Sequence, residues 1–94
     1  GPFREYAATK RELAESVARL AREWAPDTRV NGVAPGPVLA PEGAREAAGD
    51  LPLGRRPTPE DVARAVAFLA ESDSVTGQIL FVDGGQHLVE GRTP

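Results

Sequence analysis

A run of four apolar residues near the end of the chain, Ile79–Val82, constrains the fold most strongly. A strand with one face in water alternates apolar and polar residues, whereas a strand covered on both faces is continuously apolar. A second strand, rich in β-branched residues, is predicted over Arg29–Ala34, and Pro35-Gly36-Pro37 ends it. A helix is predicted between the two strands, and this order favours a parallel crossover. The sequence therefore predicts an α/β fold with a parallel sheet.

The first helix is predicted over Glu5–Trp24. Its apolar positions recur at helical spacings of four, three and four, and the charged residues between them form an outer face. Pro26 should stop the helix soon after Trp24. The predicted buried stripe consists of Leu13, Val17, Leu20 and Trp24.

A second helix is predicted to begin after Thr58, which is a good N-cap. Pro59 suits the first helical position, and the acidic residues Glu60 and Asp61 complement the positive end of the helix dipole. Its predicted buried stripe consists of Val62, Ala65, Val66 and Leu69. A short helix around Glu42–Ala48 is also considered, within a stretch punctuated by proline and glycine.

Two strands alone make a poor sheet, because parallel sheets need both faces covered and normally contain more strands. The predicted pair therefore resembles the carboxyl-terminal end of a doubly wound sheet whose other strands come from elsewhere. We expect the chain to self-associate or to pair with such a missing half, since its apolar stripes cannot all be buried within one small monomer.

Composition excludes several classes of function. The chain has 94 residues, 40% of them apolar, and no stretch approaches the ~20 apolar residues of a membrane span. Acidic residues outnumber basic ones, 14 to 11, and no basic run is present, which argues against nucleic-acid binding. Cysteine is absent, and no cluster of carboxylates or histidines suggests a metal. The start of the sequence does not resemble a secretory signal, and the absence of cysteine fits a cytoplasmic protein.

Tyr6 and Lys10 carry the chemistry that this sequence suggests. Four residues along a helix rise about 6 Å and turn slightly past one revolution, so the two side chains project from one face. An ammonium group nearby favours the phenolate and lowers the pKa of a phenol, as does the first turn of a helix. Such a phenol can donate a proton to a carbonyl oxygen or remove one from an alcohol. Taken alone, the pair has an ordinary alternative, in which Lys10 is solvated and Tyr6 packs its ring at the start of the helix.

Five segments, in order across nearly the whole chain, resemble the carboxyl-terminal portion of the short-chain dehydrogenase/reductase family. Each segment is weak evidence by itself, but their order and separations together are specific. They are Tyr6-Ala7-Ala8-Thr9-Lys10, Arg29-Val30-Asn31-Gly32-Val33-Ala34-Pro35-Gly36, Pro52-Leu53-Gly54-Arg55, Thr58-Pro59-Glu60-Asp61-Val62-Ala63, and Thr76-Gly77-Gln78 followed by Val82-Asp83-Gly84-Gly85.

The resemblance implies that residues 1–94 are the carboxyl-terminal part of a single Rossmann-like domain that transfers a hydride between NAD or NADP and a small carbonyl or alcohol substrate. It implies that Tyr6 is the general acid/base and that Lys10 tunes it and holds the nicotinamide ribose. The residues after the first strand, Pro35, Gly36, Pro37 and Val38, are the further expected cofactor contacts, because ligands bind at the carboxyl ends of strands in open α/β sheets. A plain turn is the alternative for Pro35-Gly36.

This chain departs from the family at one point. The family usually places a threonine or serine a few residues past this Pro-Gly, where it meets the nicotinamide carboxamide. The stretch from Pro37 to Pro41 contains no hydroxyl, so backbone groups around Val38 would have to substitute. A hydroxyl-free stretch of this kind is similar to the pteridine-reductase-like branch of the family.

Most other polar or aromatic residues are interpreted as structural. Asn31 is expected to form hydrogen bonds beside the strand, and Trp24 is expected in the core. His87 is expected at the surface, although in the family the tail can reach the pocket of a neighbouring subunit. Asp83, with its two following glycines, is interpreted as a strand exit that permits close packing and not as a metal site.

The family's glycine-rich phosphate loop lies upstream of the tyrosine, and only five residues precede Tyr6 here. Two interpretations follow. In the first, which we favour, the chain is part of an NAD(P)-dependent reductase, inactive by itself and working within a homodimer or homotetramer. In the second, it is a truncated, non-catalytic relative that acts as a binding or assembly module.

Overall fold

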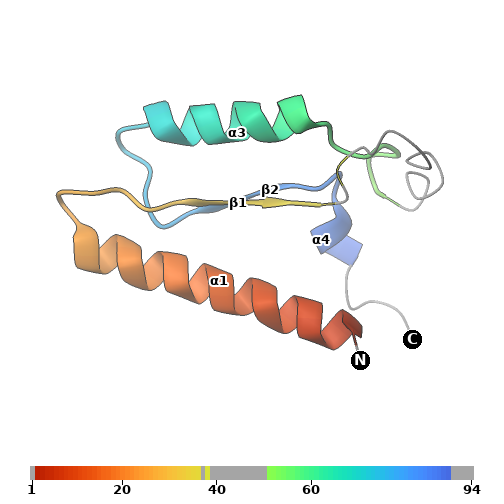
Figure 1. The fold of residues 1–94 in the computed structure, drawn as a ribbon, viewed down its shortest axis with the longest axis horizontal. Coiled ribbons are helices and arrows are strands. Elements are labelled where there is room, and N and C mark those ends of the chain that lie inside the picture. The colour runs from red at the N-terminus through yellow and green to blue at the C-terminus, as the bar shows by residue number, and fades with distance from the viewer. Residues whose placement is uncertain (1, 37, 39–50, 90–94) are drawn as a thin grey trace.

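The computed structural model describes residues 2–36, 38 and 51–89, with side chains from residue 8 onward. Its elements are α1 (Pro2–Trp24), β1 (Gly32–Pro35), α3 (Pro59–Glu71), β2 (Ile79–Val82) and α4 (Gln86–Val89). The two strands lie between α1 on one face and α3 on the other, which gives three layers (Figure 1). The predicted α/β architecture is confirmed. The short helix considered around residues 42–48 lies outside the described residues.

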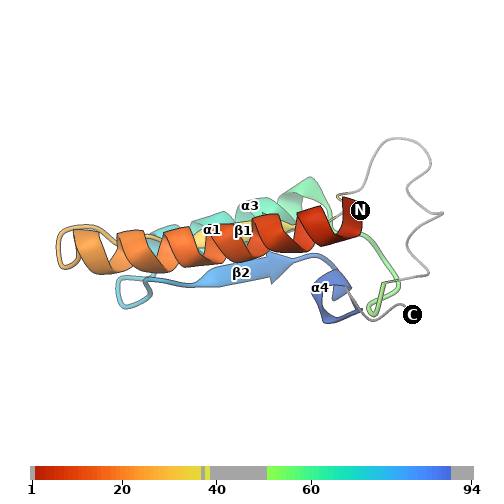
Figure 2. The same cartoon turned by 90° about the horizontal axis from the view of Figure 1, so that it is seen from below.

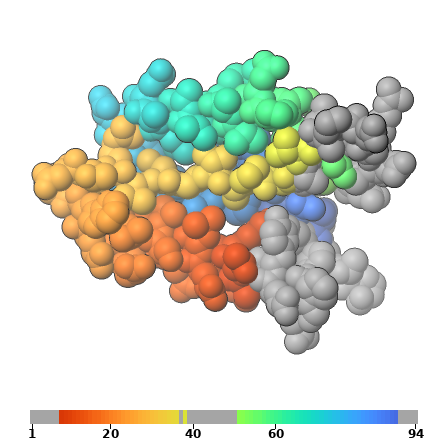
Figure 3. Space-filling view, viewed as in Figure 1, coloured from red at the N-terminus to blue at the C-terminus, as the bar shows by residue number. Residues whose placement is uncertain are grey.

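The sheet is the predicted parallel pair. Gly32 lies opposite Ile79, and Pro35 lies opposite Val82. Each strand therefore has one partner within the described chain. In the space-filling view, β1 forms a row of atoms between the two helical layers (Figure 3).

The structure places the start of β1 three residues later than predicted. The Val30 carbonyl accepts a backbone hydrogen bond from the Gly77 N–H at 2.8 Å, but side chains take part in two further bonds at Val30 and Asn31. Thr76 Oγ1 accepts a hydrogen bond from the Val30 N–H at 3.0 Å, and Asn31 Oδ1 accepts one from the Gln78 N–H at 3.0 Å. The backbone ladder of the parallel pair begins only at Gly32, and it continues to Pro35, one residue past the predicted end. The predicted structural role of Asn31 is confirmed.

Close packing of α1 on the sheet depends on a glycine. A Cβ atom on Gly32 would lie 2.8 Å from Ile79 Cδ1 and 3.4 Å from Val17 Cγ2. The absence of a side chain thus lets Val17 of α1 and Ile79 of β2 meet over β1. The small buried core consists of Val17, Ala21, Ala34, Leu51, Ala65 and Leu69.

Of the stripe predicted for α1, only Val17 is in the core, and Leu20 is partly buried. Leu13 is 44% exposed and Trp24 is 49% exposed, whereas Ala21, which the prediction omitted, is buried. A helix of 23 residues is about 34 Å long, but strands of four residues span only about 13 Å. The helix is therefore longer than the surface it packs on, and parts of its stripe lack a partner within the described chain.

The prediction that β2 is covered on both faces holds only in part. The strand bounds are confirmed, and helices lie on both sides of the sheet, yet Leu80 is 37% exposed and Phe81 is 36% exposed. On α3, Val66 is 52% exposed although it belongs to the predicted stripe.

The α3 helix begins as its sequence predicts. The Thr58 hydroxyl accepts a hydrogen bond from the Asp61 N–H at 3.1 Å, and the Asp61 carboxylate accepts one from the Thr58 N–H at 2.9 Å. The capping role of Thr58 is confirmed, and Asp61 completes a reciprocal capping box. Within the described ranges, no helix is long and apolar enough to cross a membrane.

Candidate active site at the carboxyl ends of the strands

The amino-terminal end of α1 lies at the same end of the molecule as the carboxyl ends of β1 and β2. Two perpendicular views agree on this arrangement (Figures 1 and 2). Tyr6 and Lys10 both belong to α1, one helical turn apart and in the half of the helix that lies at this end. The fold therefore brings the predicted catalytic pair to the edge of the sheet where open α/β proteins bind ligands. The Tyr6 side chain lies outside the described part of the structure.

Lys10 extends from α1 to the second strand. Its Nζ atom lies over the Phe81 ring, 5.6 Å from the ring centroid. A cation within about 6 Å of an aromatic face is attracted by the negative potential of that face. The ammonium group is thus held near β2, at the position where Phe81 pairs with Ala34, two residues before Gly36.

His87 lies against the same ring. The imidazole and the Phe81 ring are stacked, with centroids 4.2 Å apart and an angle of 15° between their planes. The prediction that His87 is a surface residue holds in part, because its side chain is one-third exposed but contacts both Phe81 and Asp83. The chain turns at Gly84 and Gly85, which both have positive φ values, and this turn brings α4 back onto the strand.

Asp83 orients His87. Its carboxylate lies 2.9 Å from His87 Nδ1, and it also accepts hydrogen bonds from the backbone N–H groups of Gly85 and His87, each at 2.9 Å. Asp83 is 3% exposed, which is more buried than its interpretation as a simple strand exit suggests. The Nδ1 contact favours the tautomer in which Nδ1 carries the proton and donates it to the carboxylate.

The pKa of Asp83 is lowered from its ordinary value of 3.8. Burial acts in the opposite direction, because it penalises the charged carboxylate. The hydrogen bonds from the His87 backbone, the His87 ring and the Gly85 backbone outweigh that penalty, with a further contribution from the charge of His87. Asp83 is therefore an ionised, fully engaged carboxylate at neutral pH.

The expected cofactor contacts after β1 lie at this same edge. Pro35 is exposed, Gly36 and Val38 are partly exposed, and Pro37 lies outside the described residues. The Gly36 N–H donates to the Val82 carbonyl at 3.0 Å, so this N–H is not available to a ligand. A Cβ atom on Gly36 would lie 2.5 Å from Asp83 Cβ, so glycine permits this close approach of the two strand ends.

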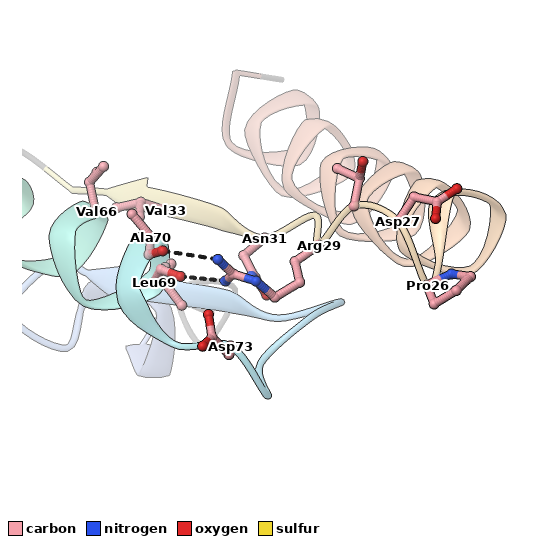
Figure 4. Close-up of a pocket in the computed structure, with 10 residues that line it drawn as sticks. Pro26, Asp27, Arg29, Asn31, Val33, Val66, Leu69, Ala70 and Asp73 are labelled. Atoms are coloured by element: carbon pink, nitrogen blue, oxygen red, sulfur yellow. Dashed lines mark hydrogen bonds between the residues drawn. The ribbon is translucent and has the colours of Figure 1, made fainter.

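Two hollows mark opposite ends of the sheet. The smaller, about 300 Å³, lies at the carboxyl end of β2, where Phe81, Asp83 and Gly85 meet the segment Arg55–Pro57. The larger, about 660 Å³, lies at the other end, beside the chain that enters β1 (Figure 4). There the Arg29 guanidinium donates to the carbonyls of Leu69 and Ala70, at 2.7 and 2.9 Å, and to that of Ser72.

Two polar side chains that line the larger hollow stabilise the fold. Arg29 was predicted as a strand residue, but it binds the last carbonyls of α3, and Asn31 Nδ2 donates to the Val75 carbonyl at 2.8 Å. The side chains of Arg29 and Asn31 are thus bonded to backbone groups. In the described ranges, no group of three or more histidine, aspartate or glutamate side chains could hold a metal ion.

Comparison with known proteins identifies the fold. The family described as "Enoyl-(Acyl carrier protein) reductase" matches residues 2–87. The chain belongs to the short-chain dehydrogenase/reductase family. It is 42% identical to a cyclohexanol dehydrogenase of Rhodococcus and 46% identical to carbonyl reductase family member 4 of Danio rerio. These matches cover 90% and 89% of this chain, but only 36% and 38% of the relatives.

A solved structure supports the same conclusion. FolM alternative dihydrofolate reductase 1 from Brucella canis, complexed with NADP, superimposes with a TM-score of 0.81 at 42% identity. The match covers 95% of this chain and 36% of that enzyme. The predicted resemblance is therefore confirmed, including the similarity to pteridine-reductase-like enzymes. The chain spans about a third of the length of the proteins it matches.

Proposed function

We propose that this chain is the carboxyl-terminal, catalytic part of an NAD(P)-dependent oxidoreductase that interconverts a carbonyl compound and an alcohol. The observation that carries the proposal is the position of Lys10. Its ammonium group lies against Phe81 at the carboxyl end of the sheet, one helical turn after Tyr6 on α1. Membership of a family of oxidoreductases supports the same reaction.

In this proposal Tyr6 is the general acid/base. A phenol with an ordinary pKa of about 10 is a poor acid or base near neutrality. A lysine one turn away favours the phenolate, and so does the positive end of the helix dipole. Tyr6 would then donate its proton to the substrate carbonyl oxygen, or take the proton back in the reverse direction.

The cofactor would be NADP or NAD, which supplies the hydride when it is bound. The residues at the carboxyl edge fit its nicotinamide end, because Lys10 places a cation there and the backbone at Gly36 and Val38 is partly exposed. Lys10 would hold the ribose, and the Pro35–Val38 segment would border the nicotinamide, with Pro37 as a further predicted contact. The complex of the Brucella enzyme with NADP supports NADP as the first candidate.

We further propose that the pyrophosphate of the cofactor is bound by an amino-terminal half of the same fold, of the kind that the longer relatives contain. Anion binding in such folds depends on a glycine-rich turn and the start of its helix. The 94-residue chain alone should then bind NADH and NADPH weakly. Micromolar binding measured by calorimetry would contradict the proposal that the pyrophosphate is bound by an amino-terminal half.

A second candidate is a non-catalytic assembly module, and one observation favours it. Large apolar side chains on α3 and β2 are exposed in the described chain, including Phe68 at 56% and Leu80 at 37%. Such a surface is typical of a contact between subunits. A homodimer or homotetramer is compatible with either candidate, and sedimentation of the chain measures it.

A chimera separates the two candidates. The part of the Danio rerio carbonyl reductase that precedes the matched region is joined to this chain, and oxidation of NADPH is followed with a carbonyl substrate. A catalytic chain should give turnover, and Tyr6→Phe should lower it by ~10²–10⁴-fold without loss of helical signal. The unmodified Danio rerio enzyme and its own tyrosine variant are the controls. Turnover within a few-fold of the parent after Tyr6→Phe would contradict the catalytic assignment and favour the assembly module.

A further inference from the structure

Four side chains from three separate elements form a continuous row at the carboxyl end of the sheet. Lys10 comes from α1, Phe81 from β2, and His87 from α4, while Asp83 lies in the turn between β2 and α4. The Lys10 ammonium lies over the Phe81 ring, the ring is stacked on His87, and His87 Nδ1 contacts Asp83. The five family segments include Lys10 and Asp83, but they explain neither the aromatic ring nor the histidine.

The side chains of this row are held by more contacts the further they lie from Lys10. Asp83 is buried and is held by two backbone N–H groups, those of Gly85 and His87. It therefore fixes the orientation of the His87 imidazole, whose own backbone is bonded to the same carboxylate. The imidazole in turn covers the Phe81 ring in an almost parallel stack. A ring that is 36% exposed would otherwise be free to change rotamer.

We propose that Phe81 and His87 are positioning residues for Lys10, with Asp83 as their anchor. The stack holds one aromatic face beneath the lysine side chain, so that the ammonium stays at the carboxyl edge of the sheet. The consequence for catalysis rests on the proposed function of Lys10, whereas the positioning itself does not. Simple core packing of Phe81 would bury the ring without requiring either a cation or an oriented histidine beside it.

The sequence makes a direct test possible, because Lys10 is its only lysine. Protein grown with ¹³C-labelled lysine gives one set of side-chain NMR signals, all from Lys10. If the ammonium lies over the Phe81 ring, the ring current should move the Lys10 ε-proton signal upfield of the value for an exposed lysine. A signal at the exposed-lysine position in the parent chain would overturn the proposal at once.

Variants then show whether the Phe81 ring causes the upfield shift of the Lys10 signal. Phe81→Leu should return the Lys10 signal to the exposed-lysine position, and Phe81→Tyr, which keeps a ring, should preserve the upfield shift. Phe68→Leu is the matched control, because it removes an exposed aromatic ring from α3 and should leave the signal unchanged. Circular dichroism verifies that each variant retains its helices. If Phe81→Leu folds and the signal does not move, the ring does not position Lys10.

His87 is tested by His87→Gln, which removes the stacked imidazole but leaves Phe81 in place. The upfield shift should be reduced, because the Phe81 ring is then less restrained. An unchanged Lys10 signal in this folded variant would exclude His87 as a positioning residue. Since His87 is also the only histidine, its ring signals report independently whether Phe81→Leu breaks the stack.

The effect of this positioning on catalysis is measured in the chimera. Phe81→Leu should raise the KM for NADPH several-fold, and Phe81→Tyr should restore it. If the Lys10 signal responds as expected but neither KM nor turnover changes, the positioning stands and the role given to Lys10 in the proposed function is wrong. If the signal does not respond, the positioning fails, whatever Tyr6→Phe shows.

Discussion

The two ends of the sheet use polar side chains in different ways. At the amino end, Arg29, Asn31 and Thr76 all bind backbone groups of segments 40 or more residues away in sequence. At the carboxyl end, Lys10 lies over the Phe81 ring, this ring is stacked on His87, and His87 contacts Asp83. The first arrangement joins elements of the fold, whereas the second places ionisable groups beside an accessible edge.

The difference shows why the size of a hollow is a poor guide to chemistry here. Among the residues that line the larger one, at the amino end, Arg29 already binds carbonyls at the end of α3 (Figure 4). The smaller one is lined in part by Asp83 and Phe81, two residues of the row that begins at Lys10. Substitution of Arg29 at the amino end should therefore lower stability alone, whereas substitution of Lys10 at the carboxyl end should lower turnover.

The largest effect is expected at Lys10, in the chimera. Lys10→Ala removes both the charge that favours the phenolate of Tyr6 and the proposed ribose contact, so the affinity for NADPH should fall together with turnover. Turnover should fall by ~10²–10⁴-fold, as for the loss of a general acid/base. Because the pair acts as a unit, Tyr6→Phe combined with Lys10→Ala should cost far less than the product of the single losses. Steady-state kinetics of the three variants measure this, and multiplicative losses would show that the residues act independently.

Asp83→Asn should have the second largest effect, on stability. The substitution keeps the shape of the side chain but replaces one accepting oxygen with a donor, so a buried N–H group loses its partner. The free energy of unfolding should fall by about 2–3 kcal/mol at pH 7, as measured by denaturant titration.

The same residue predicts a pH dependence with a definite sign. Because the folded-state pKa of Asp83 is lowered, its contribution is fully present above the ordinary value of 3.8 and is lost as the pH falls through the folded-state pKa. The stability difference between the parent and Asp83→Asn should therefore shrink at acidic pH. A difference that stayed constant from pH 7 to the acid limit would mean that the carboxylate charge contributes nothing.

Local signals in the sequence predicted much of the fold. The bounds of β2 and the start of α3 are confirmed because each depends on adjacent residues: an apolar run, and a cap followed by proline and acids. The end of α1 at Trp24 is likewise confirmed. In contrast, the start of β1 was misplaced, because Asn31 and Thr76 replace ladder bonds only once two distant segments meet.

The site was predicted less completely, for a similar reason. The Tyr6–Lys10 spacing is visible in the sequence, but its role stays a prediction. The row of Phe81, His87 and Asp83 depends on how Gly84 and Gly85 turn the chain at positive φ. The Asp83-Gly84-Gly85-Gln86-His87 sequence offers a signal that could have been used, since an acid four residues before a histidine suits a hydrogen bond within a single turn.

At the amino end, Arg29→Lys should have a smaller effect than Asp83→Asn and should not change turnover. Lysine keeps the positive charge but loses the planar fork that binds three carbonyls of α3 and the residue after it. The free energy of unfolding should fall by about 1–2 kcal/mol, with kinetic constants of the chimera unchanged. A fall in turnover without a loss of stability would contradict the division between the two ends.

The smallest effect is expected at Thr58, which caps the other end of the same helix. Thr58→Ala removes the oxygen that accepts from the Asp61 N–H and should cost about 1 kcal/mol of stability. Thr58→Ser keeps the hydroxyl and should retain most of this stability.

The pKa of Asp61 is lowered chiefly by the hydrogen bond from the Thr58 backbone, so this part of the cap should weaken as the pH falls through the folded-state pKa of Asp61. Although Thr58 lies at the carboxyl end of the sheet, its hydroxyl bonds to a backbone N–H, just as Arg29 bonds to backbone carbonyls. Thermal melts should show the expected loss while the KM for NADPH stays constant. This result would mean that the type of bonding partner, and not the position along the sheet, separates structural from catalytic side chains. A raised KM would instead show that the position of a residue along the sheet matters more.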